Sequence, residues 1–393
     1  VEARARFLAG NLEEAATTLQ VAASIEPDNF RFHFNLGIVL HLLERHQDAV
    51  DAFTTAVTIG TDDDEMLAEA FTGLGLSQLH AGHAQAAVNT LKSAIAADPS
   101  ADREYLGLTV RYRAGEGASL LPDVLDAAQR SGDYRFDLLA GRIYRDLRDF
   151  TSSDTHLARA EERTAGDTDL AQVLMQRAAM LIDAGAKPKI LLGQVRDLDP
   201  QLWQASYNLG VFALQERQYP VAIELLSEAF QHSRGATSVT IALARAHLNA
   251  GDYQAALTYA QRALEASGGD HAAFTAALAA YHQGNYEGAD LFLQGVDFAS
   301  QPVDARALAG AVKYQLRDFS GALAHFEAAY RQSPTMDLRR NLVNAMLATS
   351  RFQDAAVHLR EMTRNNPNEG MLHQQLGWAE HMLGNTIDAQ LAF

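Results

Sequence analysis

Apolar and small side chains recur along this chain with the period of amphipathic helices, and polar turns separate the recurring segments. The clearest example is the segment 203–230, WQASYNLGVFALQERQYPVAIELLSEAF, in which a polar stretch at 215–219 divides two apolar patterns. Residues three or four apart on a helix share one face, so each pattern gives its helix a single apolar stripe. The inward positions are Leu209, Gly210 and Ala213 in the first helix and Ala222, Leu226 and Ala229 in the second. The segment is therefore predicted to form two short helices that fold back on each other.

The same helix pair returns about every 34 residues through most of the sequence. One such pair cannot bury its apolar stripe alone, so neighbouring pairs must stack and share a continuous core. We therefore expect one solenoid rather than several separate globular domains. Complete units are expected at about 30–63, 68–101, 102–133, 134–167, 169–202, 203–236, 237–269, 270–302, 303–335 and 336–369, with partial units at 1–29 and 370–393. Because both ends cut through a unit, we interpret the chain as a fragment of a longer array.

The order of large, small and apolar residues in these units resembles the tetratricopeptide repeat. Leu209, Gly210, Ala222 and Leu226 carry the resemblance. It implies an all-α fold, an α-solenoid in which antiparallel helix pairs form a right-handed superhelix. It also implies a concave face, lined by the first helix of each pair, on which extended peptides or partner helices lie. The function that this resemblance implies is a scaffold for protein–protein interaction without catalytic activity.

Glycine or alanine recurs at one place in the first helices, where two backbones must approach closely. These positions are Gly37, Gly75, Gly210, Ala244, Gly310 and Gly377. A bulky side chain at such a place would overpack a helix contact, at a cost of about 1–3 kcal/mol. The pattern is weakest in the units 102–133 and 169–202, where we expect a changed curvature.

The composition narrows the kinds of partner. The chain has 393 residues and a formal net charge of -17. Nucleic acids and anionic membranes both attract basic surfaces, so we expect neither as a partner. No apolar run approaches the roughly 18 residues that a spanning helix needs. Without cysteine the chain has no thiolate nucleophile or thiolate metal site, and its compartment, cytoplasmic or periplasmic, stays open, although the absence of cysteine is compatible with a periplasm.

The sequence contains no complete motif of the known enzyme classes that we considered. Gly73-x-Gly75 lacks the third glycine of a dinucleotide-binding loop, since Gln78 takes its place. The segment YRDL at 144–147 lacks the histidine of a kinase catalytic loop, and Thr151 stands where that loop has asparagine. We therefore expect no catalytic residue and no cofactor.

Histidines gather at two helix ends. His80 and His83 lie three residues apart across a turn, and His41 lies close in sequence to Glu44 and His46. Spacing places no third ligand beside either group. A weak metal site is one interpretation of these groups, but the lack of a third ligand favours solvated or packed histidines, and we expect no metal site.

Arginine marks the expected concave face near the middle of the chain. Arg135, Arg142 and Arg145 are separated by seven and three residues, which puts them on one face of a first helix. Arginines at similar places in other units extend this stripe, namely Arg103, Arg113, Arg177 and Arg245. One interpretation is that the stripe attracts an anionic partner, such as an acidic peptide segment. The other is that the arginines form weak surface ion pairs. The acidic residues available for such pairs are Asp102, Glu104, Asp137 and Asp146.

Asparagine and aromatic residues also lie toward the expected inner face. Asn35 and Asn208 precede Leu-Gly. The resemblance implies that an asparagine at this place hydrogen-bonds a bound peptide backbone, although other units interrupt the series. Phe34, Tyr207 and Trp378 are candidate binding anchors, since aromatic side chains dominate many interfaces. Trp378 has a second interpretation, as core whose covering unit lies beyond residue 393.

The sequence thus predicts a non-catalytic scaffold that holds a segment of a partner protein in a concave groove. One alternative is that the chain resembles the periplasmic helical repeat region of bacterial exopolysaccharide export proteins. Abundant alanine and arginine with scarce lysine fit a GC-rich bacterial source. Another is the substrate-selecting array of an enzyme whose catalytic domain lies outside this sequence. Exposed terminal units would also allow self-association.

Overall fold

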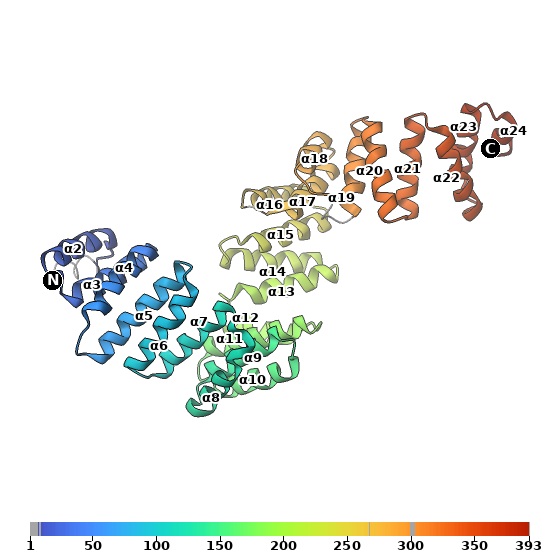
Figure 1. Ribbon diagram of the computed structural model, residues 1–393. Coiled ribbons are helices and arrows are strands. Elements are labelled where there is room, and N and C mark those ends of the chain that lie inside the picture. Colours follow the sequence, from blue (N-terminus) through green and yellow to red (C-terminus); the bar gives the residue numbers. More distant parts are fainter. Residues whose placement is uncertain (1–6, 8, 267, 299–302, 393) are drawn as a thin grey trace. The chain divides into compact units, whose positions relative to one another are not determined.

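The fold consists of helices joined by short connections (Figure 1). The computed structural model describes residues 7, 9–266, 268–298 and 303–392. Every regular element in this part of the chain is a helix, and the helices follow one another in antiparallel pairs. The predicted all-α solenoid of helix pairs is therefore confirmed. Among the described helices, none has both the length and the apolar character needed to cross a membrane.

Backbone contacts divide the chain into two compact units, 1–199 and 200–393, and each is described by itself. The helices of the first unit are α2 (Leu12–Ile25), α3 (Phe30–Leu42), α4 (His46–Ile59), α5 (Asp64–His80), α6 (Ala84–Ala97), α7 (Ala101–Arg111), α8 (Leu121–Ser131), α9 (Tyr134–Asp146), α10 (Phe150–Arg163), α11 (Asp167–Asp183) and α12 (Lys189–Leu198). Between α7 and α8 the chain forms the π-helix η1 (Tyr112–Glu116) and the 3-10 helix η2 (Gly117–Leu120). This departure lies in 102–133, one of the two units in which the repeat pattern is weakest.

The second unit continues with helix pairs of the same kind. Its helices are α13 (Trp203–Gln215), α14 (Tyr219–His232), α15 (Thr237–Ala250), α16 (Tyr253–Glu265), α17 (Gly269–His282), α18 (Tyr286–Leu293), α19 (Val303–Gln315), α20 (Phe319–Gln332), α21 (Met336–Ala348), α22 (Phe352–Asn365), α23 (Gly370–Met382) and α24 (Thr386–Ala392). The reference segment 203–230 forms α13 and most of α14, with the turn where the polar stretch predicted it.

One backbone geometry repeats in the turn inside most pairs. The residue two places before the second helix has a positive φ, as at Glu44 (59°), Gly82 (86°) and Arg148 (61°). Glycine adopts this geometry freely, whereas other residues pay about 1–2 kcal/mol for it. The turn is therefore determined by the packing of the two helices and not by glycine alone.

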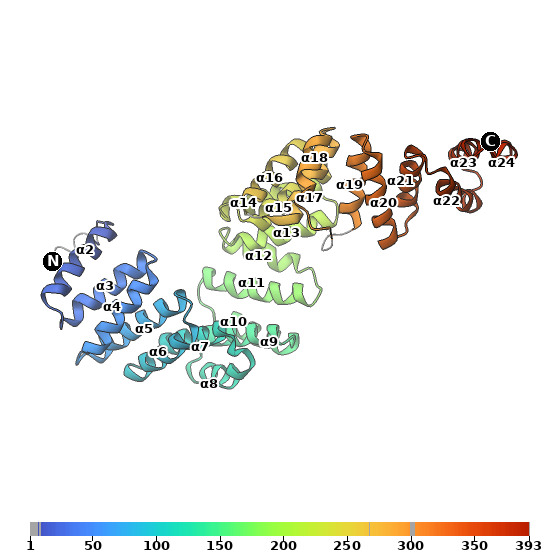
Figure 2. The ribbon, with the colours of Figure 1, turned by 45° about the horizontal axis from the view of Figure 1, so that its top comes forward.

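Each second helix packs against the first helix of its own pair and against the first helix of the next. In the first unit α4 contacts α3 and α5, and α6 contacts α5 and α7 (Figures 1 and 2). Phe53 of α4, Leu91 of α6 and Leu157 of α10 are each 1% exposed. The core therefore continues from pair to pair, which is how stacking buries apolar stripes that no single pair can cover.

Glycines in the first helices allow this close approach. A Cβ atom at Gly75 would lie 2.8 Å from Cγ of Leu91, and one at Gly210 would lie 2.7 Å from Cγ of Leu226. Carbon atoms that are not bonded to each other do not approach this closely, so a side chain at either place must displace a buried leucine.

We expect Gly75→Val to lower the free energy of unfolding of the first unit by about 1–3 kcal/mol, because the added side chain overpacks the contact with Leu91. Gly193→Val is the matched control, since Gly193 lies in α12 and a Cβ there would meet nothing within 4 Å. Its effect should stay within about 0.5 kcal/mol. Urea unfolding followed by circular dichroism measures both, and equal losses would contradict the close-approach explanation.

Candidate functional site

The first helices of successive pairs form one face of the first unit. Helix α3 packs on α5, α7 on α9, and α9 on α11. Within the described residues, no packing of comparable extent joins the second helices α4, α6 and α10 to one another. A row of helices that is closely spaced on one side and more open on the other curves toward the closely spaced side. These contacts therefore favour a concave side on the first helices, although α5 and α7 do not pack on each other to the same extent.

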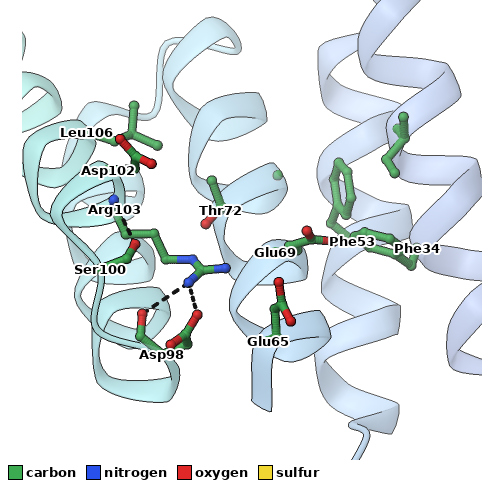
Figure 3. Close-up of a pocket in the computed structure, with 12 residues that line it drawn as sticks. Phe34, Phe53, Glu65, Glu69, Thr72, Asp98, Ser100, Asp102, Arg103 and Leu106 are labelled. Atoms are coloured by element: carbon green, nitrogen blue, oxygen red, sulfur yellow. Dashed lines mark hydrogen bonds and ion pairs between the residues drawn. The ribbon is translucent and has the colours of Figure 1, made fainter. Parts of the chain in front are cut away.

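A hollow of about 590 Å³ opens between α3, α5 and α7 (Figure 3). One wall is apolar and consists of Phe34, Ile38 and Phe53. Phe34 packs on Phe53 with ring centroids 6.1 Å apart, so this wall continues directly into the core of the first unit. The remaining wall is polar apart from Leu106 and is formed by α5 and the segment that leads from α6 into α7.

Carboxylates dominate the polar wall. Its charged residues are Glu65, Glu69, Asp98, Asp102 and Arg103. Arg103 forms an ion pair with Asp98 and also donates from Nη1 to the Asp98 main-chain oxygen at 3.2 Å. Glu65 and Glu69 are exposed, and neither has an ion-pair partner among the residues that the structure describes. The hollow is therefore acidic, because the charge of Arg103 is neutralised by Asp98 while Glu65 and Glu69 have no ion-pair partner within the described ranges.

Arg135 is also engaged by carboxylates. Its Nη2 atom lies 2.6 Å from Oδ1 of Asp102 and 2.6 Å from Oδ2 of Asp133, and its guanidinium lies 5.1 Å from the ring centroid of Tyr105. The hydrogen bonds to Asp133 raise the pKa of Arg135, and the same contact lowers the pKa of Asp133. Arg135 and Asp102 are thus one of the ion pairs that the sequence left open as an alternative.

Two further arginines of the predicted stripe form ion pairs with different kinds of helix. Arg145 donates from Nε to Asp183 of α11 at 2.6 Å, a contact between neighbouring first helices. Arg177 donates to Asp154 at 2.8 Å and to Glu161 at 2.8 Å, both on α10. Arg177 therefore contacts the second helix of the preceding pair, and it does not extend the row formed by Arg135 and Arg145.

The other predicted arginines have different surroundings. Arg113 is exposed in η1, and Arg245 is exposed on α15 of the second unit. Arg142 is partly buried, and its Nε atom has no hydrogen-bond partner. No ion pair is recorded for these three within the described part of the chain. The seven arginines thus do not form one continuous basic surface.

The acidic residues proposed as partners of the stripe mostly have other contacts. Asp146 accepts a hydrogen bond of 2.5 Å from the hydroxyl group of Tyr112. Burial and this contact raise the pKa of Tyr112 to about 12. Asp137 binds His156 and Arg163 instead of a stripe arginine.

Asparagines at the predicted groove position differ between the two units. Asn35 is exposed on α3. Asn208 of α13 donates from Nδ2 to the main-chain oxygen of Gln204 at 2.8 Å, so part of its amide is engaged within its own helix. Of the two aromatic residues nearby, Phe34 lines the hollow of the first unit, and Tyr207 packs partly buried against the core of the second.

Trp378 lines a separate hollow of about 410 Å³ in the second unit. It is 42% exposed, and its ring packs edge-on against Phe352 with centroids 5.3 Å apart. Tyr314, Asn344 and Gln375 line the same hollow, and Gln375 donates from Nε2 to Oδ1 of Asn344 at 2.8 Å. Amide and aromatic side chains without a net charge can hydrogen-bond and stack on a neutral segment of peptide.

Sequence reasoning missed the acidic residues Glu65, Glu69 and Asp98. A signal was present for Glu69, because it lies six residues before Gly75, just as Arg135 lies six residues before Gly141. The two side chains therefore occupy the same place in their repeats with opposite charge. Asp98 lies at the end of α6, where the repeat pattern predicts only a helix terminus.

The sequence matches known families in three places. Residues 3–43 match a TPR repeat profile, and residues 213–281 and 307–370 each match a tetratricopeptide repeat profile. No curated protein matches the chain.

Solved structures with a similar arrangement of helices are only distantly related in sequence. The APC/C hetero-tetramer Cut9–Hcn1 is 14% identical with a TM-score of 0.44, and the comparison covers 99% of this chain and 88% of that one. The human IFIT1 dimer with m7Gppp-AAAA is 13% identical with a TM-score of 0.45, covering 93% of this chain and 88% of that one. Similarity at this level identifies neither a partner nor a ligand. The repeat matches, together with the helix pairs of both units, show that the chain is a tetratricopeptide repeat protein, and these repeats support the role of a protein-interaction scaffold.

Proposed function

We propose that the concave face of the first unit binds an extended, basic segment of a partner protein. The observation that carries this proposal is the hollow between α3, α5 and α7, in which Glu65 and Glu69 are exposed without ion-pair partners opposite an apolar wall. A segment with lysine or arginine beside an apolar side chain is complementary to both walls.

The charge of the hollow favours a basic segment over an acidic one. Arg103, which lines the hollow, is paired with Asp98, and the lining residue Asp102 is paired with Arg135, which also binds Asp133. An acidic segment would have to displace these pairs and approach two further carboxylates. Like-charge contacts at an interface cost several kcal/mol, so they act against such a partner.

The apolar wall supplies the second half of the recognition. Phe34 and Ile38 are partly buried and remain accessible from the hollow. Interfaces derive most of their binding energy from a few anchors inserted into pockets, whereas exposed ion pairs mainly determine orientation and partner choice. We assign the apolar contact to affinity and the carboxylates to specificity, with no catalytic step.

Charge reversal in the hollow tests the proposal. The probes are two fluorescent peptides of about 12 residues with a central leucine, one carrying lysines and arginines and the other glutamates in their place. We expect the basic peptide alone to bind, and Glu65→Lys/Glu69→Lys to weaken it at least about tenfold, because two attractions become repulsions. Fluorescence anisotropy at physiological salt measures both dissociation constants.

Asp51→Lys/Asp126→Lys is the matched control for net charge. Both aspartates are exposed on second helices, α4 and α8, and neither lines the hollow. At physiological ionic strength charges farther than about 8 Å are largely screened, so this control should leave binding of the basic peptide unchanged. Equal loss of affinity for the basic peptide in both double variants would contradict the proposed groove. Equal binding of the basic and acidic peptides by the wild-type protein would also contradict it.

A further inference from the structure

Three histidines from three helices of the first unit converge at one edge of the solenoid. His41 lies near the end of α3, His46 begins α4, and His80 ends α5. Their ring centroids are 5.2 Å apart for His41 and His46, 5.3 Å for His41 and His80, and 5.0 Å for His46 and His80. One ring nitrogen from each residue lies within 4.8 Å of the other two.

The hydrogen bonds of two rings determine which of their nitrogens carries the proton. Ser77 donates its hydroxyl to the main-chain oxygen of Gly73 at 2.8 Å, so its oxygen accepts from Nδ1 of His41 at 2.9 Å. Nδ1 of His80 donates to the main-chain oxygen of Leu76 at 2.8 Å. Both rings therefore carry their proton on Nδ1 and leave Nε2 with a free lone pair. Histidines that ligate metals almost always donate their other ring nitrogen in this way.

The third ring contains a polar atom without a partner. Nδ1 of His46 is shielded from solvent and makes no hydrogen bond. The three imidazoles do not hydrogen-bond one another, so no proton shared between them explains their approach. A buried polar atom without a partner is costly, and a bound ion is one of the few explanations for it in a native protein.

The chemistry of the three side chains indicates which kind of ion they could bind. Burial lowers the pKa of His41, and the charges of His80 and His46 lower it further. No carboxylate belongs to the group. A set of neutral imidazole ligands suits zinc, copper or nickel, whereas calcium and magnesium require oxygen ligands.

We propose that His41, His46 and His80 form a binding site for a divalent transition metal ion of the zinc class, with a water molecule in the fourth position. Zinc binds histidine nitrogen at about 2.0–2.1 Å in tetrahedral geometry, so the three nitrogens would stand about 3.3 Å apart. The rings must therefore close by at most about 1.5 Å from their present separation. Rotation of the exposed His80 side chain at the end of α5 allows part of this movement.

The position of the site suggests its role. His41 and His46 belong to one helix pair, and His80 belongs to the first helix of the next. An ion held by all three would join two neighbouring repeats at the end where their turns lie. A ligand that binds only the folded state raises its stability, so the metal would stabilise the first unit.

Zinc titration of the full chain, with any histidine tag removed, tests the proposal. We expect isothermal titration calorimetry to show one site for Zn²⁺ per chain and the unfolding midpoint of the first unit to rise with added Zn²⁺. His80→Gln should lower the affinity for Zn²⁺ at least about 100-fold. This exceeds the 10–100-fold loss that is typical when a residue that only hydrogen-bonds a metal ligand is replaced. Ser77→Ala should weaken it about 10–100-fold, because Ser77 orients His41.

His83→Gln is the matched control. His83 lies three residues after His80 and precedes α6, but it is not part of the cluster. Its substitution should leave the Zn²⁺ isotherm unchanged. Equal weakening by His80→Gln and His83→Gln, or no saturable binding by the wild-type chain at micromolar Zn²⁺, would overturn the site. His80 is exposed, and circular dichroism of the variant without metal verifies that it folds.

Discussion

Asp137→Ala is expected to lower the free energy of unfolding of the first unit by about 3 kcal/mol or more. The Asp137 side chain on α9 is 1% exposed and forms ion pairs with His156 and Arg163 of α10. His156 donates from Nδ1 to Oδ1 of Asp137 at 2.8 Å, so this histidine is charged or carries its proton on Nδ1. The carboxylate thus ties the two helices of one pair together inside the core.

The size of this effect follows from what the substitution leaves behind. Removing one partner of a buried pair costs about 3–5 kcal/mol, because the remaining charge stays desolvated without compensation. His156 is 9% exposed and can regain little water. Arg163 is 37% exposed and can be rehydrated, so we expect a value at the lower end of the range.

Asp126→Ala provides the comparison for a surface pair. Asp126 and Arg130 are paired within α8 at 2.8 Å, with side chains 66% and 55% exposed. Exposed pairs of this spacing contribute about 0.3–0.5 kcal/mol. Because repeat proteins can unfold pair by pair, amide hydrogen exchange of α9 and α10 should accompany urea unfolding. Similar decreases in the free energy of unfolding for Asp137→Ala and Asp126→Ala would show that the buried pair stabilises the fold no more than the exposed pair.

Phe53→Ala should cost about 3–5 kcal/mol, the range for truncating a buried aromatic side chain. Phe53 is 1% exposed, and its ring lies between two glycines of neighbouring first helices. A Cβ atom would lie 2.7 Å from the ring at Gly37 and 2.5 Å from it at Gly73. The surrounding backbones cannot easily fill the resulting cavity, because both helices are held by contacts with their other neighbours.

A double-mutant cycle distinguishes this packing from a general loss of apolar area. Gly73→Ala should destabilise the wild-type chain by overpacking Phe53, and it should be better tolerated in the Phe53→Ala background, where space is free. Val21→Ala is the surface control, since Val21 of α2 is 55% exposed and its truncation should cost within about 0.5 kcal/mol. Additive effects of the substitutions at 53 and 73 would contradict the interlocked arrangement. Chemical denaturation of the first unit measures all of these variants.

Local periodicity explains why the helix pairs could be predicted. The spacing of Leu209, Gly210 and Ala213 determines one buried face of the first helix. The turn was predictable because this apolar pattern stops and a polar stretch follows it. The glycine positions were predictable for the same reason, since a small residue at a fixed place in each first helix indicates close approach. Arg148 in its turn shows the limit of this reasoning, because its positive φ has no sequence signal of the kind that glycine provides.

Charged partners could not be predicted to the same extent. The seven arginines were expected to lie on one face, but Arg177 contacts α10 while Arg145 contacts α11. Long side chains reach about as far as the distance between neighbouring helices, so a small rotation of a helix changes which carboxylate is nearest. The acidic hollow beside Phe34 depends on the same rotations.

The sequence by itself determined an all-helical repeat, its turns and its buried faces, because each of these depends on residues within one helix pair. Only the tertiary structure decided which polar groups meet. His41 and Ser77 are 36 residues apart and become hydrogen-bonded only when α3 packs on α5. The same packing brings His80 to His41 and His46, although spacing along the chain pairs it with His83. Contacts between repeats depend on how one pair is rotated against the next, and no local pattern records that rotation.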